Sequence, residues 1–93
     1  MEIKYSTHME TRIRLRKIDH ALPKEIYENA EERYMDAETG YAIAVKKVLI
    51  YEKERDVMVA YKQEDIDVKL VTIHPLKEGQ KEQRLKTGRW RKI

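Results

Sequence analysis

Three segments of alternating apolar and polar residues follow one another between residues 41 and 74, and the turns between them are short. "YAIAVKKVLIY" is followed by Glu52 and "KERD", which turns the chain into "VMVAYK", and "QEDID" turns it into "VKLVTIH". Alternation with a period of two is typical of strands, and turns this short join antiparallel neighbours. The segment therefore predicts a three-stranded antiparallel sheet. Pro75 cannot donate a ladder hydrogen bond and predicts the end of the last strand just after His74.

The segment before the sheet predicts a short strand over residues 2–6 and two helices. Thr7 is followed three residues later by Glu10, the spacing of a capping box, which favours a first helix over residues 8–17. Apolar residues at odd positions from Ile3 onward are also compatible with one long strand, and this alternative stays open. A proline at position 23 and apolar spacings of three and four predict a second helix over residues 23–35.

A third helix is predicted over residues 78–86, because Gly88 is placed to end it. The predicted order is β-α-α-β-β-β-α, an α+β domain with an antiparallel sheet and all helices packed on one face. A chain of 93 residues encloses one core, so residues 1–93 are expected to form a single domain. The candidate core residues are Ile26, Ala30, Val45, Val59, Val71 and Leu85.

Composition narrows the class of protein. The absence of cysteine excludes disulfides and thiolate zinc sites, and no apolar run approaches the ~20 residues that span a bilayer. The first ten residues lack the pattern of a secretory signal, so we expect a cytoplasmic protein with no membrane partner. Charged residues make up 40% of the chain, a usage found in proteins of heat-loving prokaryotes.

The charges are distributed unevenly. Residues 1–24 hold six basic and three acidic residues, residues 25–76 hold seven and twelve, and residues 77–93 hold seven and two. If the fold brings the two basic ends together, they form a positive face suited to a nucleic-acid backbone. The alternative is two unrelated solvated segments.

His8, Arg12 and Arg16 follow one another at intervals of four residues and would share one stripe of the first helix. The guanidinium fork matches phosphate oxygens, and an imidazole transfers protons near neutral pH. The stripe therefore predicts a phosphate site, with an ordinary salt-bridged helix face as the alternative. Val68, Leu70, Thr72 and His74 are expected to share one face of the last strand, where His74 either acts as a base or caps a turn.

The C-terminal segment combines basic residues with one tryptophan. Cations hold phosphates and an indole stacks on a base, so the segment predicts single-stranded nucleic-acid binding. Trp90 has packing against the sheet as its alternative role. The candidate nucleic-acid-binding residues are Lys81, Arg84, Lys86, Arg89, Trp90 and Arg91.

Several other kinds of site are excluded or not expected. The three histidines are far apart in sequence and form no H-x-x-x-H pair, so we expect no metal and no cofactor. The three glycines stand alone, which excludes a phosphate-binding P-loop. The single serine has no G-x-S-x-G context, which argues against a serine hydrolase.

The pattern H-x-x-x-R-x-x-x-R-x-I, formed by His8, Arg12, Arg16 and Ile18, and the strand "VKLVTIHP" resemble a family of short prokaryotic domains of unknown function. That family is in turn similar in layout to the RelE and BrnT toxins, small ribonucleases of toxin-antitoxin pairs. The resemblance implies a RelE-like fold, metal-independent cleavage of messenger RNA and an antitoxin partner.

Under this resemblance, His8 or His74 carries the proton, Arg12 and Arg16 hold the phosphate, and the basic C-terminal residues contact the RNA backbone. Some such toxins use Arg, Lys and Tyr without histidine, in which case Tyr61 or Tyr34 takes the role of the imidazole. A noncatalytic domain of the same fold that binds nucleic acid or protein through its basic ends is the alternative. A third possibility is a structural domain whose charges only keep it in solution.

Overall fold

The computed structural model describes residues 1–93 and confirms the α+β class. The elements are β1 (Ile3–Tyr5), α1 (Thr7–Arg16), α2 (Leu22–Glu28), β2 (Glu32–Asp36), β3 (Ala42–Ile50), β4 (Lys53–Glu64), β5 (Asp67–Pro75), α3 (Gln80–Lys86) and β6 (Trp90–Lys92). The three strands predicted between residues 41 and 74 are β3, β4 and β5. None of the three helices has the length and apolar character needed to cross a membrane.

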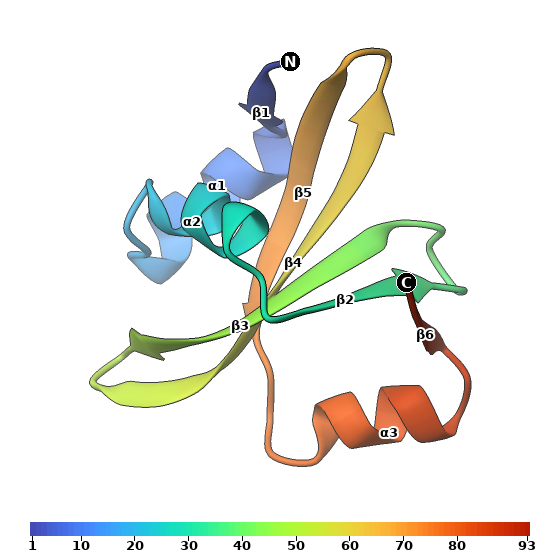
Figure 1. Cartoon of the computed structure of the whole chain (residues 1–93). Helices are drawn as coiled ribbons and strands as arrows, with labels where there is room; N and C mark the ends of the chain where they lie inside the picture. Colours follow the sequence, from blue (N-terminus) through green and yellow to red (C-terminus); the bar gives the residue numbers. More distant parts are fainter.

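All six strands belong to one sheet, in the order β1-β5-β4-β3-β2-β6. β1 runs parallel to β5, and every other neighbouring pair is antiparallel. The first and last strands therefore lie at opposite edges of the sheet, and the two chain ends are apart in Figure 1. Because β1 and β6 are not neighbours in the sheet, these two strands do not bring the basic ends of the chain together.

The predicted helix over residues 23–35 is wrong in its second half. α2 ends at Glu28, and Glu32–Asp36 form β2, which pairs with β3 on one side and with β6 on the other. Helix propensity differs by less than about 1 kcal/mol per residue among ordinary residues. Two flanking strands that satisfy the backbone of β2 outweigh that preference. β6 itself was not predicted, because three residues are too few to show alternation.

The sheet has an apolar cluster on each face. The first cluster joins α1 and α2 to the sheet through residues such as Met9, Ile26 and Leu70, all 0% exposed. The second contains Tyr34, Ile43, Val45, Met58, Ala60, Leu76 and Trp90. Of the predicted core residues, Ile26, Val45 and Val59 are buried, Ala30 and Val71 are partly buried, and Leu85 is exposed, because α3 buries no side chain.

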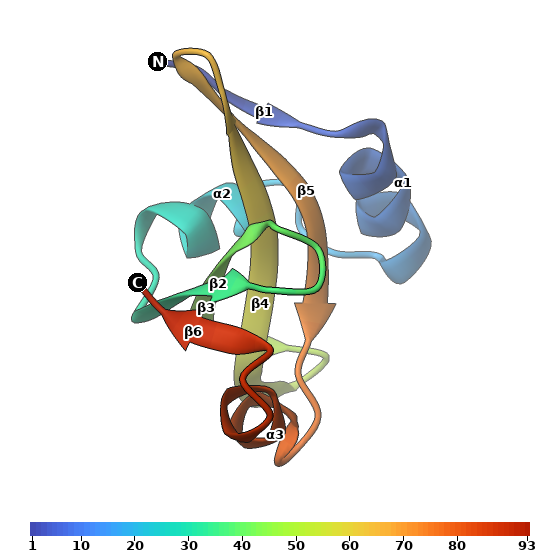
Figure 2. The same ribbon diagram turned by 90° about the vertical axis from the view of Figure 1, so that its right-hand side faces the viewer.

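The helices do not all pack on one face, contrary to the prediction. α1 and α2 lie together on the side of the first cluster (Figure 1). α3 lies below β6 and away from both of them in Figure 2. Lys81 of α3 binds Glu32 and Asp56, whose strands present these residues on the same side as Tyr34 and Met58.

Ser6, rather than the predicted Thr7, caps α1. The Ser6 hydroxyl accepts a hydrogen bond from the Met9 amide at 2.9 Å and donates one to the Val71 carbonyl of β5 at 2.7 Å. The Ser6 amide also donates to the Leu70 carbonyl at 3.0 Å. One residue therefore ends the pairing of β1 with β5, begins α1 and fixes the helix beside β5.

We expect Ser6→Ala to lower the free energy of unfolding by about 1–2 kcal/mol, because it removes the N-cap and leaves the Val71 carbonyl without its hydroxyl partner. Thr7→Ala is the matched control, since the Thr7 side chain is exposed. Urea unfolding followed by circular dichroism measures both. Equal effects of the two substitutions would contradict the assignment of Ser6 as the cap.

Candidate active site

A β-bulge in β5 decides where His74 points. Leu70 is opposite Tyr61 of β4, but Thr72 is opposite the next residue, Ala60, so that Val71 is an extra residue in β5. A bulge of this kind interrupts the alternation of side chains along its strand.

The bulge separates residues that were predicted to share one face. Val68 and Leu70 pack in the first cluster. Thr72 and His74 are paired with Ala60 and Met58, which belong to the second cluster, so their side chains lie on the opposite face. The prediction that all four residues of β5 share a face is therefore wrong.

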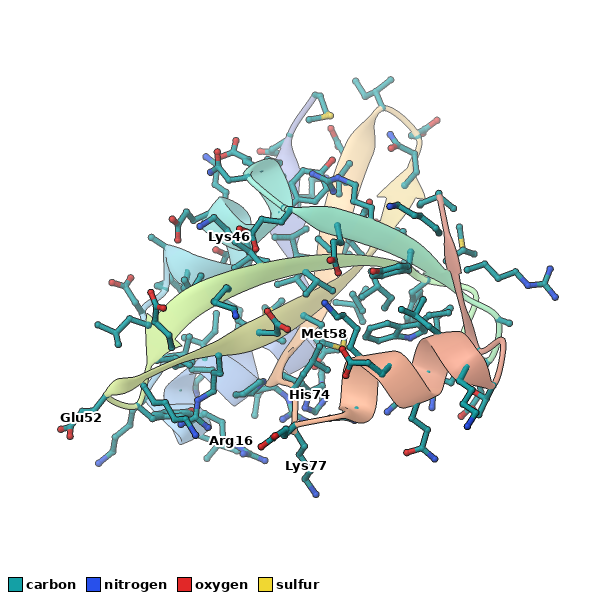
Figure 3. The ribbon with its side chains drawn as sticks, turned by 60° about the horizontal axis from the view of Figure 1, so that its bottom comes forward. Arg16, Lys46, Glu52, Met58, His74 and Lys77 are labelled. Atoms are coloured by element: carbon teal, nitrogen blue, oxygen red, sulfur yellow. The ribbon has the colours of Figure 1, made fainter.

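The first helix and the last of the three predicted strands do meet. Arg12 Nη1 of α1 lies 3.4 Å from His74 Nδ1. α1 follows the short β1 and therefore runs beside the part of β5 that has no strand at its outer edge. In Figure 3, His74 lies near Met58 and the start of α3, and Arg16 lies on the same side of the molecule.

The surroundings of His74 are basic. Burial lowers the pKa of the His74 imidazole below its usual value, and the charges of Arg12, Arg16, His8 and Arg84 lower it further. His74 is therefore neutral at pH 7. These groups come from α1 and α3, which are separated by most of the chain.

The contact with Arg12 also fixes the tautomer of the neutral imidazole. A guanidinium has five N–H donors and no acceptor, so the Nδ1 atom of His74 must accept and its proton must be on Nε2. In this state the imidazole has an N–H donor at Nε2. Arg12 Nε is buried without a hydrogen-bond partner, so one donor of the guanidinium is unpaired.

The six predicted nucleic-acid-binding residues divide into two groups. Lys81 binds Glu32 at 3.0 Å, Arg89 binds Asp36 at 3.1 Å, and Trp90 is 2% exposed. These three stabilise the fold, and Trp90 has the packing role that was the alternative to base stacking: its ring stacks on Tyr34 with centroids 5.5 Å apart. Lys86 and Arg91 are exposed, and Arg84 is partly buried near His74.

The Asp36–Arg89 pair is the one place where a carboxylate is buried. Burial by itself raises the pKa of the Asp36 carboxyl, but hydrogen bonds from Arg89 and from the Glu38 amide outweigh it, so that the pKa lies below its usual value. Asp36 is therefore ionised at neutral pH and compensates the charge of Arg89.

The two tyrosines proposed as substitutes for histidine pack and form hydrogen bonds away from His74. Tyr61 packs against the first cluster and accepts a hydrogen bond from Arg33 at 3.0 Å. Burial, followed by the hydrogen bond to Glu32, raises the pKa of Tyr34 to about 12. Neither side chain is suited to transfer a proton beside His74. No group of three or more metal-ligating side chains is arranged to hold a metal ion.

The position of Arg84 beside His74 is the part of the site that sequence analysis missed. Arg84 was predicted only as a contact of the basic tail, because nothing in a sequence reports how α3 turns back toward β5. Thr72, by contrast, was placed next to His74 by the period of two along the strand, and the structure places it on the same face.

We expect the titration midpoint of His74, followed by NMR on its ring protons, to lie below the usual value of about 6.5. Arg12→Ala should raise this midpoint, whereas Arg14→Ala, an exposed arginine of the same helix, should not. Because the unfolded chain takes up this proton first as the pH falls, the free energy of unfolding should decrease below pH ~6.5. An unchanged midpoint in Arg12→Ala would contradict the contact.

We also expect long-range ¹H–¹⁵N spectra at neutral pH to show the Nε2–H tautomer for His74. The reason is the Nδ1 acceptor position opposite Arg12. A mixture of tautomers in the unmodified protein would show that Arg12 does not donate to the ring. Arg12→Ala is the reference, because its His74 ring lacks the donor that favours the Nε2–H tautomer.

Comparisons of the chain with protein-family models, with curated proteins and with solved structures found no match. The RelE-like resemblance therefore stays a prediction, as do the antitoxin partner, the cytoplasmic location and the heat-loving source. Inference about function depends on the geometry around His74.

Proposed function

We propose that this protein is a metal-independent ribonuclease whose reactive centre is formed by His74 and Arg12, with Arg16, Arg84 and His8 around them. The observation that carries the proposal is the 3.4 Å approach of Arg12 Nη1 to His74 Nδ1, which joins α1 to β5. A neutral imidazole beside guanidinium groups is the combination that a phosphodiester transfer requires: a proton acceptor and a holder of negative charge.

Phosphate binding prepares the base in this proposal. An arginine forms stronger, bidentate hydrogen bonds with a phosphate than with a neutral nitrogen. When the scissile phosphate of RNA arrives, Arg12 turns its fork to the phosphate oxygens and gives up its contact with His74. The Nδ1 lone pair is then free to take a proton, and the low pKa of His74 keeps the ring unprotonated until that moment.

The chemical step is a transfer of the phosphodiester from the 5′-oxygen to the 2′-oxygen. His74 removes the proton of the ribose 2′-hydroxyl, the 2′-oxygen attacks phosphorus, and the bond from phosphorus to the 5′-oxygen breaks. Arg12, Arg16 and Arg84 stabilise the charge on the phosphorane. His8, exposed at the start of α1, is the second imidazole of the cluster and donates the proton to the departing 5′-oxygen. The products are a 2′,3′-cyclic phosphate and a 5′-hydroxyl.

The second candidate is a noncatalytic domain that binds RNA through the same basic cluster. Its supporting observation is that Arg12 occupies the Nδ1 acceptor of His74, which leaves the ring a hydrogen-bond donor. A donor imidazole and three arginines bind phosphate without transferring a proton. This candidate predicts salt-sensitive binding with no turnover.

Incubation of labelled single-stranded RNA with the protein in EDTA tests the proposal. We expect cleavage to 2′,3′-cyclic phosphate ends, and a fall of about 10²–10⁴-fold in rate for His74→Ala because the general base is lost. Arg12→Ala should reduce the rate by about 10²–10³-fold through loss of charge stabilisation.

The matched controls are His20→Ala and Arg14→Ala. His20 is exposed and binds Glu10 at 2.7 Å, away from His74, and neither control should alter the rate. RNA that is retained at low salt but stays intact would favour the noncatalytic candidate. RNA that is neither cut nor bound would contradict both.

A further inference from the structure

A cavity of about 210 Å³ adjoins His74 on the face of the sheet that α1 and α2 leave uncovered. Ile43, Met58 and Ala60 of the two central strands provide its apolar lining. His74 also lines it, so the cavity is continuous with the candidate active site. Pockets for drug-sized ligands measure roughly 300–1,000 Å³, and this one is suited to a smaller occupant.

Two polar atoms belonging to residues of the cavity wall have no hydrogen-bond partner. Thr72 Oγ1 and Trp90 Nε1 are both shielded from water, and Trp90 is 2% exposed. Buried polar groups in folded proteins are nearly always paired, so two orphans in one wall indicate a missing partner. Trp90 Nε1 donates only, whereas a threonine hydroxyl both donates and accepts. The occupant must therefore present an acceptor.

The charges at the rim of the cavity indicate whether the occupant carries a charged group. Arg89 is neutralised by Asp36, which it contacts at 3.1 and 3.2 Å. Arg84 has no carboxylate partner, and its guanidinium lies 5.7 Å from the centroid of the Trp90 ring. A cation free of any ion pair, at the border between an apolar cavity and the Arg12–His74 contact, is suited to an anion attached to a flat ring.

We propose that this cavity binds one pyrimidine base of the RNA strand, with the adjoining phosphate between Arg84 and Arg12. The inference deepens the proposed function, on which its RNA substrate rests. A single ring matches the small volume, and a carbonyl oxygen of the base accepts from Trp90 or Thr72. Met58 and Arg84 are flexible side chains of the same wall, and binding requires such side chains to change rotamer so that the base reaches the two shielded atoms.

Trp90 is the only tryptophan of the chain, so its indole N–H gives one resolved signal in a ¹H–¹⁵N spectrum. We expect uridine 3′-monophosphate to shift this signal saturably, and adenosine 3′-monophosphate to do so at least fivefold more weakly. Inorganic phosphate should shift the ring signals of His74 and leave Trp90 unchanged. Equal affinity for the two nucleotides would overturn the assignment to a pyrimidine.

Thr72→Val removes the hydroxyl while keeping the shape of the side chain. It should weaken the binding of uridine 3′-monophosphate at least fivefold, with no change in the response of His74 to phosphate. Thr11→Val, an exposed threonine of α1, is the control and should leave both responses unchanged. Binding of the nucleotide that is insensitive to Thr72→Val would overturn the site.

The two proposals fail separately. If phosphate shifts His74 but the uridine nucleotide leaves Trp90 unchanged, the base pocket is wrong and the ribonuclease proposal is unaffected. If the nucleotide shifts Trp90 and RNA is not cut, the pocket is supported and the ribonuclease proposal is wrong. A pyrimidine preference at the cleavage sites that is lost in Thr72→Val would support both.

Discussion

The extra residue in β5 determines which side chains of that strand meet the helices and which meet the open face of the sheet. Up to Leu70 the strand presents its apolar residues to α1 and α2. Beyond Val71 the alternation is shifted, and Thr72 and His74 face the second cluster. Without the bulge, the same period of two would direct Thr72 and His74 to the side of Leu70, into the helix-covered core.

Ser6 connects this bulge to the rest of the site. Its hydroxyl binds the carbonyl of Val71 and the first turn of α1 at the same time. The helix is therefore attached to the strand at the position where the side chains change face. Two turns of the helix suffice to bring Arg12 to His74, and the imidazole receives its guanidinium neighbour from an element that otherwise packs on the opposite face.

Two residues of the basic C-terminal segment, Lys81 and Arg89, contribute to the fold rather than to a charged surface. Lys81 and Arg89 are paired with acidic residues of the central part of the chain, which explains why the acidic middle and the basic end coexist. Charges that look available in a sequence are in this way compensated inside the fold. Arg84 of the same segment has no acidic partner and contributes to the field at His74.

Much of this protein can be predicted from its sequence. Apolar residues that recur with a period of two indicate the three-stranded meander, and spacings of three to four residues indicate the position of α1. Both patterns depend only on neighbours in the chain. The same patterns place Arg12 and Arg16 on one stripe and Thr72 beside His74. The second half of the predicted helix over residues 23–35 shows the limit, since β2 is a strand only because β3 and β6 satisfy its backbone.

The sequence by itself determined the α+β class, the stop at Pro75 and the residue types available for phosphate chemistry. Tertiary structure alone decided that Val71 bulges, that Arg12 and Arg84 both act on His74, and that Trp90 closes a core instead of facing solvent. The physical reason is that these outcomes depend on contacts between residues far apart in the chain. Such contacts are fixed by pairing across the sheet and by burial, and neither leaves a local period in the sequence.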